Sequence, residues 1–234
     1  MSRTVAVIQA RLGSYRLPQK MLATIGDLPI IEWVVTRVRR SELVDRVIVA
    51  TTLERIDDRL VEECERLGVE VKRGPTDDVL KRFVDVLVGD DAGTVVRVCG
   101  DNPLIDPECI DRAIREFRDS RAEYAFNHRP LADCNYADGL GAEVVSRNLL
   151  ERLNAAKLSP QQREHVTLAL VDGTIRSQVH ACVAPVALAH PELRFDVDTR
   201  EDLIKMNELV DAARITVLSD AVSIVRAILQ RGVS

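Results

Sequence analysis

Apolar positions along the first half of the chain follow two alternating kinds of spacing. Residues 5–8 form an unbroken apolar run, as expected of a strand covered on both faces, and we expect further strands at 44–51, 69–72 and 94–99. Between these runs, apolar residues recur at helical spacing and predict helices at 30–38, 56–67, 79–87 and 110–117. Alternation of strand and helix implies right-handed crossovers and a parallel sheet, so the expected fold class is α/β.

The pattern changes in residues 124–186, where Asn, Asp, Pro and Gly interrupt the apolar spacing. Strand-like pieces at 143–146 and 176–183 have no regular helix between them. We therefore expect an inserted region with antiparallel strands, suited to a second substrate and a dimer partner, within one domain spanning 1–234. Core elements return at the end of the chain, as a strand at 195–197 and helices at 203–210 and 222–229.

Length and composition fit one large α/β domain. The chain has 234 residues, 46% apolar and 29% charged, which is ordinary for a globular protein. Its net charge of −5 argues against a polymeric nucleic acid as partner, because such binders need a basic face. The five cysteines are widely spaced, and no C-x-x-C or Cys/His cluster indicates zinc. Reduced core thiols and the lack of a long apolar run predict a cytoplasmic protein without a membrane segment.

The segment after the first strand is the strongest candidate for chemistry. Gly13 and Pro18 rule out a continued strand or helix, and Arg11, Arg16 and Lys20 stand among small residues. Backbone N–H groups can approach a ligand there while cations neutralise it, which suits a polyphosphate. A solvated surface loop is the alternative. The segment is neither a Walker loop nor a dinucleotide fingerprint, because it lacks both glycine patterns.

Three strings resemble a known family. A-R-L-G-S-Y-R-L-P-Q-K, at residues 10–20, resembles the A-R-x-G-S-x-R-L-P-x-K signature of sugar-activating nucleotidyltransferases, most closely the acylneuraminate and 3-deoxy-manno-octulosonate cytidylyltransferases. D-G-L-G-A-E-V from Asp138 and R-E-H-V-T from Arg163 resemble the spore coat polysaccharide biosynthesis (SpsF-like) branch. Gly141 stands where that branch usually has an acid, a departure that bears on the acceptor.

The resemblance implies a three-layer Rossmann-like nucleotidyltransferase fold of the GT-A type with a mainly parallel sheet. It implies a Mg²⁺-dependent cytidylyltransferase that joins CTP to an anionic sugar-like acceptor in surface polysaccharide biosynthesis and releases pyrophosphate. It also implies a homodimer formed through 131–186. Two alternatives remain at this point: a sugar-1-phosphate nucleotidylyltransferase that uses another nucleotide, and a catalytically silent nucleotide-binding subunit of a polysaccharide assembly.

Two acids are the expected ligands of Mg²⁺, which prefers carboxylate oxygens. Asp101 lies in G-D-N-P, which resembles the family's metal-holding G-D-x-P, and Asp198 lies in V-D-T-R-E-D-L, which resembles V-D-T-P-E-D-L. We expect both to converge with Lys20 on one divalent ion. Helix capping is the alternative for each acid. Asp196 is the fallback for Asp198, because both would face one side of a strand.

The resemblance also assigns the remaining contacts. Lys20 is the expected triphosphate cation, assisted by Arg11 and Ser14, with Arg16 as an equal alternative; Lys20, Arg11 and Asp101 form the expected catalytic set. Asp78 has a second interpretation as a helix N-terminal charge. The expected nucleotide contacts are Ala10, Arg11, Leu12, Gly13, Ser14, Arg16, Lys20, Thr51, Asp78, Arg82 and Gly100.

Acceptor contacts are expected in the inserted region. The resemblance indicates that Arg163 and His165 bind an acceptor carboxylate or phosphate, with a structural role as the alternative for an isolated histidine on a helix. The expected acceptor contacts are Asn127, Asp138, Glu143, Arg163 and His165.

Overall fold

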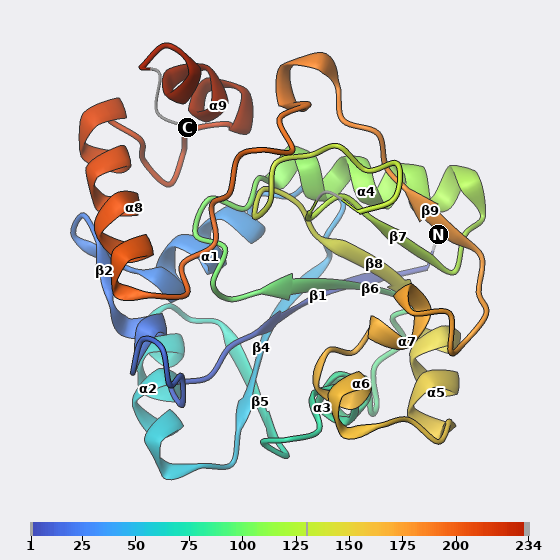
Figure 1. Cartoon of the computed structure of the whole chain (residues 1–234). Coiled ribbons are helices and arrows are strands. Elements are labelled where there is room, and N and C mark those ends of the chain that lie inside the picture. Colours follow the sequence, from blue (N-terminus) through green and yellow to red (C-terminus); the bar gives the residue numbers. More distant parts are fainter. Residues whose placement is uncertain (1, 130, 232–234) are drawn as a thin grey trace.

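One twisted sheet of seven strands organises the part of the chain that the structure, a computed structural model, describes, namely residues 2–129 and 131–231 (Figure 1). Residue 130, inside the predicted insertion, and the terminal residues 1 and 232–234 lie outside this description. In spatial order the strands are β5 (Glu70–Gly74), β4 (Arg46–Thr52), β1 (Thr4–Gln9), β6 (Thr94–Cys99), β8 (Glu143–Ser146), β7 (Tyr124–Phe126) and β9 (Val179–Ala181).

Strand β1 lies inside the parallel part of the sheet, between β4 and β6. Its residues from Thr4 to Ile8 are all buried, as the unbroken apolar run predicts. β1 pairs in parallel with β4 and β6, and β4 pairs in parallel with β5. The prediction of an α/β fold with a mainly parallel sheet is therefore confirmed.

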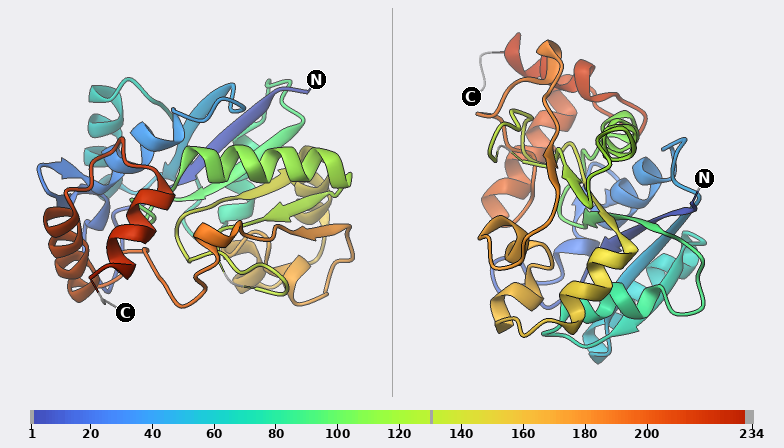
Figure 2. Two further views of the ribbon diagram at one scale, coloured as in Figure 1. Left: turned by 90° about the horizontal axis from the view of Figure 1, so that it is seen from above. Right: turned by 90° about the vertical axis from the view of Figure 1, so that its right-hand side faces the viewer.

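Helices cover the sheet on both faces. α1 packs against α4 on one face, whereas α3 packs against α5 and α6 on the other (Figures 1 and 2). α8 packs against β2 (Thr24–Ile25), which forms a small hairpin with β3 (Leu28–Pro29), and α9 packs against α8. No helix in the described ranges is both long and apolar enough to cross a bilayer. The helical segments are α1 (Ile30–Val38), α2 (Asp58–Arg66), α3 (Val79–Val86), α4 (Pro107–Ser120), α5 (Arg147–Ala155), α6 (Pro160–Glu164), α7 (Leu168–Val171), α8 (Arg200–Ala213) and α9 (Ala221–Leu229), with 3₁₀ turns η1 (Lys20–Leu22), η2 (Arg55–Asp57) and η3 (Val186–Leu188).

The region 124–186 differs from the prediction in two ways. Its strands extend the main sheet: β8 is antiparallel to both β6 and β7, but β7 and β9 are parallel. The prediction of no regular helix between 143–146 and 176–183 is wrong, because α5, α6 and α7 lie there. Ser146 caps α5, and the buried Leu149, Leu150 and Leu153 have the helical spacing that identifies this helix.

Residues 195–197 also differ from the prediction, because they form an extended segment rather than a strand. Phe195 and Val197 are buried as expected. Phe195 N donates to Asp138 O at 3.0 Å and Val197 N donates to Asp101 O at 2.9 Å. The segment therefore joins two loops instead of lying along a neighbouring strand, and these two bonds bring Asp198 to the site described next.

Candidate functional site

The loops that follow β1 and β6 meet at one edge of the sheet, because these parallel strands are neighbours. Gly100 N donates to Gln9 O at 2.9 Å. A Cβ atom at Gly100 would lie 2.8 Å from Gln9 O and 3.0 Å from Met21 Sδ, so only glycine allows this close approach. The approach places Asp101 directly beside the loop of residues 10–20.

Lys20 lies at the centre of the site. Its Nζ atom donates to Asp101 Oδ2 at 2.9 Å, to Asp198 Oδ1 at 2.9 Å and to Val197 O at 3.3 Å. Arg16 reaches the other oxygen of Asp198 at 2.6 Å. The structure therefore brings Lys20 together with two acids that are far apart in sequence, whereas the divalent ion expected there stays a prediction.

Neither acid serves as a helix cap. Asp106 caps α4 and accepts from Glu108 N and Cys109 N. Thr199 caps α8 and forms a capping box with Asp202. The carboxylates of Asp101 and Asp198 therefore remain directed at Lys20 rather than at a helix terminus.

The charges of this cluster stabilise one another. Burial opposes the charge of Lys20, but the carboxylates of Asp101 and Asp198 outweigh it and raise the Lys20 pKa. Burial likewise disfavours ionised Asp198, yet Lys20 and Arg16 hold the Asp198 pKa below its usual value. Carboxylates that share one cation are the hard oxygen donors that Mg²⁺ takes. Asp101 and Asp198 thus fit a divalent ion.

Asp196, the fallback ligand, faces a different partner. Its carboxylate forms a two-pronged pair with Arg194, whose guanidinium also lies 3.6 Å from Asp198. Of the two acids, Asp198 is the one in contact with Lys20.

The loop of residues 10–20 is held by its own hydrogen bonds. Leu12 N donates to Asp57 Oδ1 at 2.6 Å, and Ser14 Oγ accepts from Leu17 N at 3.3 Å. Leu12 N and Ser14 Oγ are therefore occupied by partners within the protein. Gly13 is exposed, and a Cβ atom there would meet nothing within 4 Å. Asp57 was missed by the sequence analysis, because its role depends on a contact between distant loops.

The side chains of Ala10 and Arg11 differ in their surroundings. Ala10 is buried and its N–H donates to Ala50 O at 3.3 Å, which continues the pairing of β1 with β4. Arg11 is 37% exposed and pairs with Glu164 at 3.3 Å. Arg11 therefore bridges the loop to α6 and keeps a solvent-facing charge.

Arg82 is the buried cation with the most unpartnered nitrogen atoms in the described ranges. The residue is only 2% exposed, and none of its three guanidinium nitrogens has a hydrogen-bond partner among the described residues. Burial and the charge of Arg11 lower the Arg82 pKa to about 10. The buried Thr51 Oγ1 also lacks a partner in the chain as described. Unsatisfied buried donors of this kind mark a place where a polar ligand fits.

Gly74 makes room for Arg82. A Cβ atom at Gly74 would lie 2.6 Å from Arg82 Cγ. Asp78 caps α3 by accepting from Lys81 N at 2.9 Å, and its other oxygen accepts from Arg163 Nε at 2.7 Å. The helix-charge interpretation of Asp78 is confirmed, and its carboxylate is committed to these partners.

A cavity of about 420 Å³ opens beside Asp101 and Asp198. Among the predicted acceptor residues, Asp138 and His165 line it, whereas Asn127, Glu143 and Arg163 do not. Arg163 instead joins Asp78 to Asn154. The full lining is Arg97, Cys99, Asp101, Asn102, His128, Arg129, Asp138, Gln161, His165, Thr167, Leu168, Asp196 and Asp198.

Glu143 and Asn127 support the cavity from behind. Glu143 accepts from Tyr124 Oη and Thr167 Oγ1, both at 2.6 Å, and pairs with Arg97. Although burial opposes its ionisation, Arg97 lowers the Glu143 pKa to about 2. Asn127 donates to Cys109 O at 2.7 Å and accepts from Ala142 N at 2.9 Å. Both side chains are thus occupied by protein partners.

Gly141 has a steric explanation. A Cβ atom at this position would lie 2.2 Å from both Asn127 O and Asn127 Oδ1. No side chain fits there while Asn127 keeps its hydrogen bonds. The missing acid is therefore part of how this loop packs.

Several cavity residues were missed by the sequence analysis. Arg97, Cys99 and Asp101 alternate along β6 and its extension, so the strand period alone would have placed Arg97 beside the predicted ligand. His128 and Arg129 carry no comparable signal. Arg97 Nε, His128 Nδ1 and Arg129 Nε are buried and unpartnered within the described ranges, and burial lowers the His128 pKa to about 4.

Asp138 is the cavity acid with the most perturbed ionisation. Burial and the charge of Asp196 raise the Asp138 pKa to about 6, against the opposing effects of Arg194 and Arg129. Cationic and acidic side chains line the same cavity and fit a ligand that carries both anionic and hydroxyl groups.

Comparisons with known proteins agree with this geometry. Residues 5–224 match the family model described as cytidylyltransferase. The chain is 34% identical over 219 residues to the spore coat polysaccharide biosynthesis protein SpsF of Bacillus subtilis, covering 91% of this chain and 88% of that protein. It is 41% identical over 115 residues to the 3-deoxy-manno-octulosonate cytidylyltransferase of Trichlorobacter lovleyi, covering 48% of this chain and 44% of that one.

A solved structure gives the same result. The cytidylyltransferase of Leptospira borgpetersenii superposes with a TM-score of 0.90 at 27% identity, covering 99% of this chain and 96% of the other. The resemblance inferred from residues 10–20, 138–144 and 163–167 is confirmed. Because the family match spans almost the whole chain, this protein is a nucleotidyltransferase that belongs to the cytidylyltransferase family.

Proposed function

We propose that this chain transfers CMP from CTP to an anionic sugar-like acceptor with the help of Mg²⁺, releasing pyrophosphate, in the biosynthesis of a surface polysaccharide. The observation that carries the proposal is the position of Lys20 Nζ, 2.9 Å from a carboxylate oxygen of both Asp101 and Asp198. A cation and two acids at one sheet edge form the electrostatic environment that phosphoryl chemistry needs.

Asp101 and Asp198 would hold the metal. When bound, Mg²⁺ would neutralise charge on the phosphates of CTP and orient them. Lys20 would then turn from the carboxylates to the triphosphate, and Arg16 and Arg11 would add charge at the exposed side of the loop. Each of these side chains acts by position and charge, so no covalent enzyme intermediate is required.

The reaction is an in-line substitution at the α-phosphorus. An acceptor oxygen forms the new bond to phosphorus while the bond to the bridging oxygen breaks, and the electron pair leaves with pyrophosphate. Asp138 is within the cavity and would take the acceptor proton when ionised. A carboxyl with a pKa of about 6 is suited to that role near neutral pH.

The unpartnered groups support an assignment of contacts to the two substrates. Arg82 and Thr51 Oγ1 would bind the nucleoside end of CTP, because both are buried beside the loop of residues 10–20 and lack partners in the described chain. Arg97 and Arg129, with His165, would bind the anionic group of the acceptor in the cavity. Arg97 would contribute through Nε, because its two Nη atoms bond Glu143 and Gln9. A guanidinium such as that of Arg129 suits a two-pronged contact with a carboxylate or phosphate.

A homodimer and a cytoplasmic location belong to the same proposal. β9 is an edge strand, and Val179, Val183 and Val186 on or after it are 48%, 56% and 92% exposed. A second copy of the chain would cover this part of residues 131–186. Light scattering during size exclusion tests it: V186E should shift a dimer toward monomer, and a monomeric wild-type protein would contradict the dimer.

Pyrophosphate release tests the activity directly. The purified protein is assayed with CTP, UTP, ATP and GTP, each with Mg²⁺ and a panel of acid sugars. We expect turnover with CTP, and D101N should lose most of the rate, whereas D91N, at an exposed pair with Arg3, should keep it. Turnover with no nucleotide, together with no metal-dependent binding of CTP, would refute the proposal and favour a silent subunit.

A further inference from the structure

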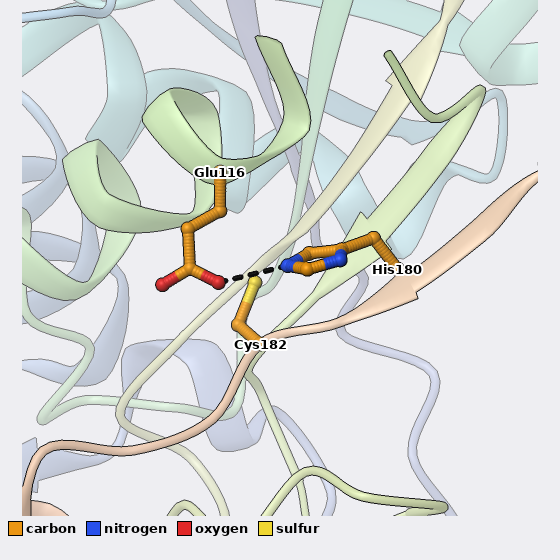
Figure 3. Close-up of side chains that lie close together, drawn as sticks. All are labelled: Glu116, His180 and Cys182. Atoms are coloured by element: carbon orange, nitrogen blue, oxygen red, sulfur yellow. Dashed lines mark hydrogen bonds and ion pairs between the residues drawn. The ribbon is translucent and has the colours of Figure 1, made fainter. Parts of the chain in front are cut away.

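A second cluster of metal-ligand side chains lies outside the cavity. Glu116 comes from α4, while His180 and Cys182 come from β9 and the residue that follows it (Figure 3). The nearest ligand atoms of the three side chains all lie within 4.8 Å of one another. His180 Nε2 and Glu116 Oε2 are 2.9 Å apart.

The backbone holds these groups in place. His180 and Cys182 are two residues apart in extended chain, so their side chains project to one side. His180 is paired in register with Ala125 of β7, and Cys182 N donates to Phe126 O at 3.0 Å. The second oxygen of Glu116 accepts from Arg112 Nε at 3.0 Å. An oxygen, a nitrogen and a sulfur ligand are thus directed at one point from two anchored elements.

A nucleophilic cysteine does not explain the cluster. An activated thiolate needs a nearby base or cation that lowers its pKa. Here His180 hydrogen-bonds Glu116, and burial, reinforced by Glu116, raises the Cys182 pKa. Cys182 is also fully buried, unlike the partly exposed sulfur of a reactive cysteine.

We propose that Glu116, His180 and Cys182 bind one zinc ion, with water as the fourth ligand. In a tetrahedral zinc site the ligand atoms lie about 3.3–3.6 Å apart, so small side-chain shifts are sufficient. Binding releases the thiol proton of Cys182 to solvent, and the thiolate favours zinc over Mg²⁺. The side chains of His180 and Glu116 are 35% and 25% exposed, so the ion enters from their side.

This site is independent of the proposed cytidylyl transfer. Its three residues are not among those that line the cavity, and it contains a soft sulfur donor where the other site has carboxylates. The ion would fasten the three-residue edge strand β9 to α4. The H-x-C spacing of His180 and Cys182 is too short to match a zinc motif, which is why the sequence analysis expected none.

The test measures metal binding without CTP or Mg²⁺. The full chain is stripped with a chelator, titrated with Co²⁺ and followed by absorption; zinc affinity is then measured by competition with a chromogenic chelator. We expect one ion per chain, a cobalt–thiolate charge-transfer band, and a tetrahedral cobalt spectrum. C182S should abolish the band, and H180N and E116Q should each weaken zinc binding by about 100-fold or more.

Two matched variants serve as controls. Cys64 is buried in α2, and His190 pairs with Glu192 at 2.8 Å, so C64A and H190N remove the same residue types elsewhere and should leave zinc affinity unchanged. Circular dichroism checks folding, and partly exposed His180 provides a variant that remains informative if C182S does not fold. Absence of the thiolate band in the wild-type protein, or unchanged zinc affinity in H180N, would overturn the proposal.

Discussion

Replacing Lys20 with methionine should increase the rise in Tm that Mg²⁺ causes in the nucleotide-free protein. Lys20 Nζ lies 2.9 Å from one oxygen of Asp101 and 2.9 Å from one oxygen of Asp198. In the wild-type protein a divalent ion must displace this ammonium group to gain both oxygens. In K20M the ammonium is absent, so the ion enters between two carboxylates that lack their shared counter-charge.

The magnitude follows from burial. Removing one partner of a buried ion pair costs about 3–5 kcal/mol, because it leaves an unpaired charge. The side chains of Lys20 and Asp198 are only 11% and 16% exposed, but Asp101 is 31% exposed and Arg16 stays 2.6 Å from Asp198. Hydration and Arg16 reduce the penalty to about 2 kcal/mol. For a domain of this size, that loss lowers Tm by about 4–8 °C.

Thermal unfolding with and without Mg²⁺ measures the effect. We expect saturating Mg²⁺ to recover most of the Tm lost in K20M and to raise the wild-type Tm much less. K81M is the control, because exposed Lys81 pairs with Asp85 at 2.7 Å and lies outside the site. Equal Mg²⁺ shifts in wild type and K20M would show that the ion does not use the oxygens that Lys20 holds, and would refute the shared site.

Three further predictions concern the cavity and its surroundings. The Asp138 pKa is raised to about 6, so protonated Asp138 stabilises the fold at low pH. This contribution is lost as pH rises from about 4 through about 6. In scanning calorimetry, D138N should therefore raise Tm at about pH 8 but not at about pH 4. G141A should lower the free energy of unfolding by about 1–3 kcal/mol in urea titration, because its Cβ would lie 2.2 Å from Asn127 O, whereas G13A should be near neutral. R82L removes a buried, unsatisfied cation, so it should raise the Tm of the nucleotide-free protein. The same variant should weaken CTP binding by about 10–100-fold in calorimetric titration. Unchanged CTP affinity would contradict the place of Arg82 in the site.

Local patterns were sufficient for the parallel half of the fold. The run at residues 5–8 needs only burial on both faces to become β1, and the glycine at position 68, with φ of +60°, follows the end of α2, close to the end at residue 67 that the apolar spacing predicts. The same rules missed α5, although Leu149, Leu150 and Leu153 have helical spacing, because the polar residues around them resembled the loops on either side. The segment 195–197 has the alternation of a strand but meets loops rather than a strand, which local pattern does not reveal.

The nucleotide half of the site follows from topology, since residues placed after neighbouring parallel strands must meet. Lys20, Asp101 and their close approach at Gly100 are of this kind. Glu143 shows the limit of such reasoning. Its motif resembles an acceptor-binding acid, but three protein partners surround it: Arg97, Tyr124 and Thr167. Only the folded chain shows that Glu143 lies behind the cavity and pairs with Arg97, which lines it.

In the proposed function, acceptor specificity would rest on pairs of contacts rather than on single residues. Arg97 enters the cavity while Glu143 holds it from behind, and Gly141 is required by the hydrogen bonds of Asn127. Changing the cavity surface alone leaves a buried partner uncompensated, which costs more than the new contact contributes. We infer that a change of acceptor needs coordinated substitutions, for example at Arg97 together with Glu143, and that E143Q alone disrupts acceptor binding through Arg97 while leaving CTP binding intact.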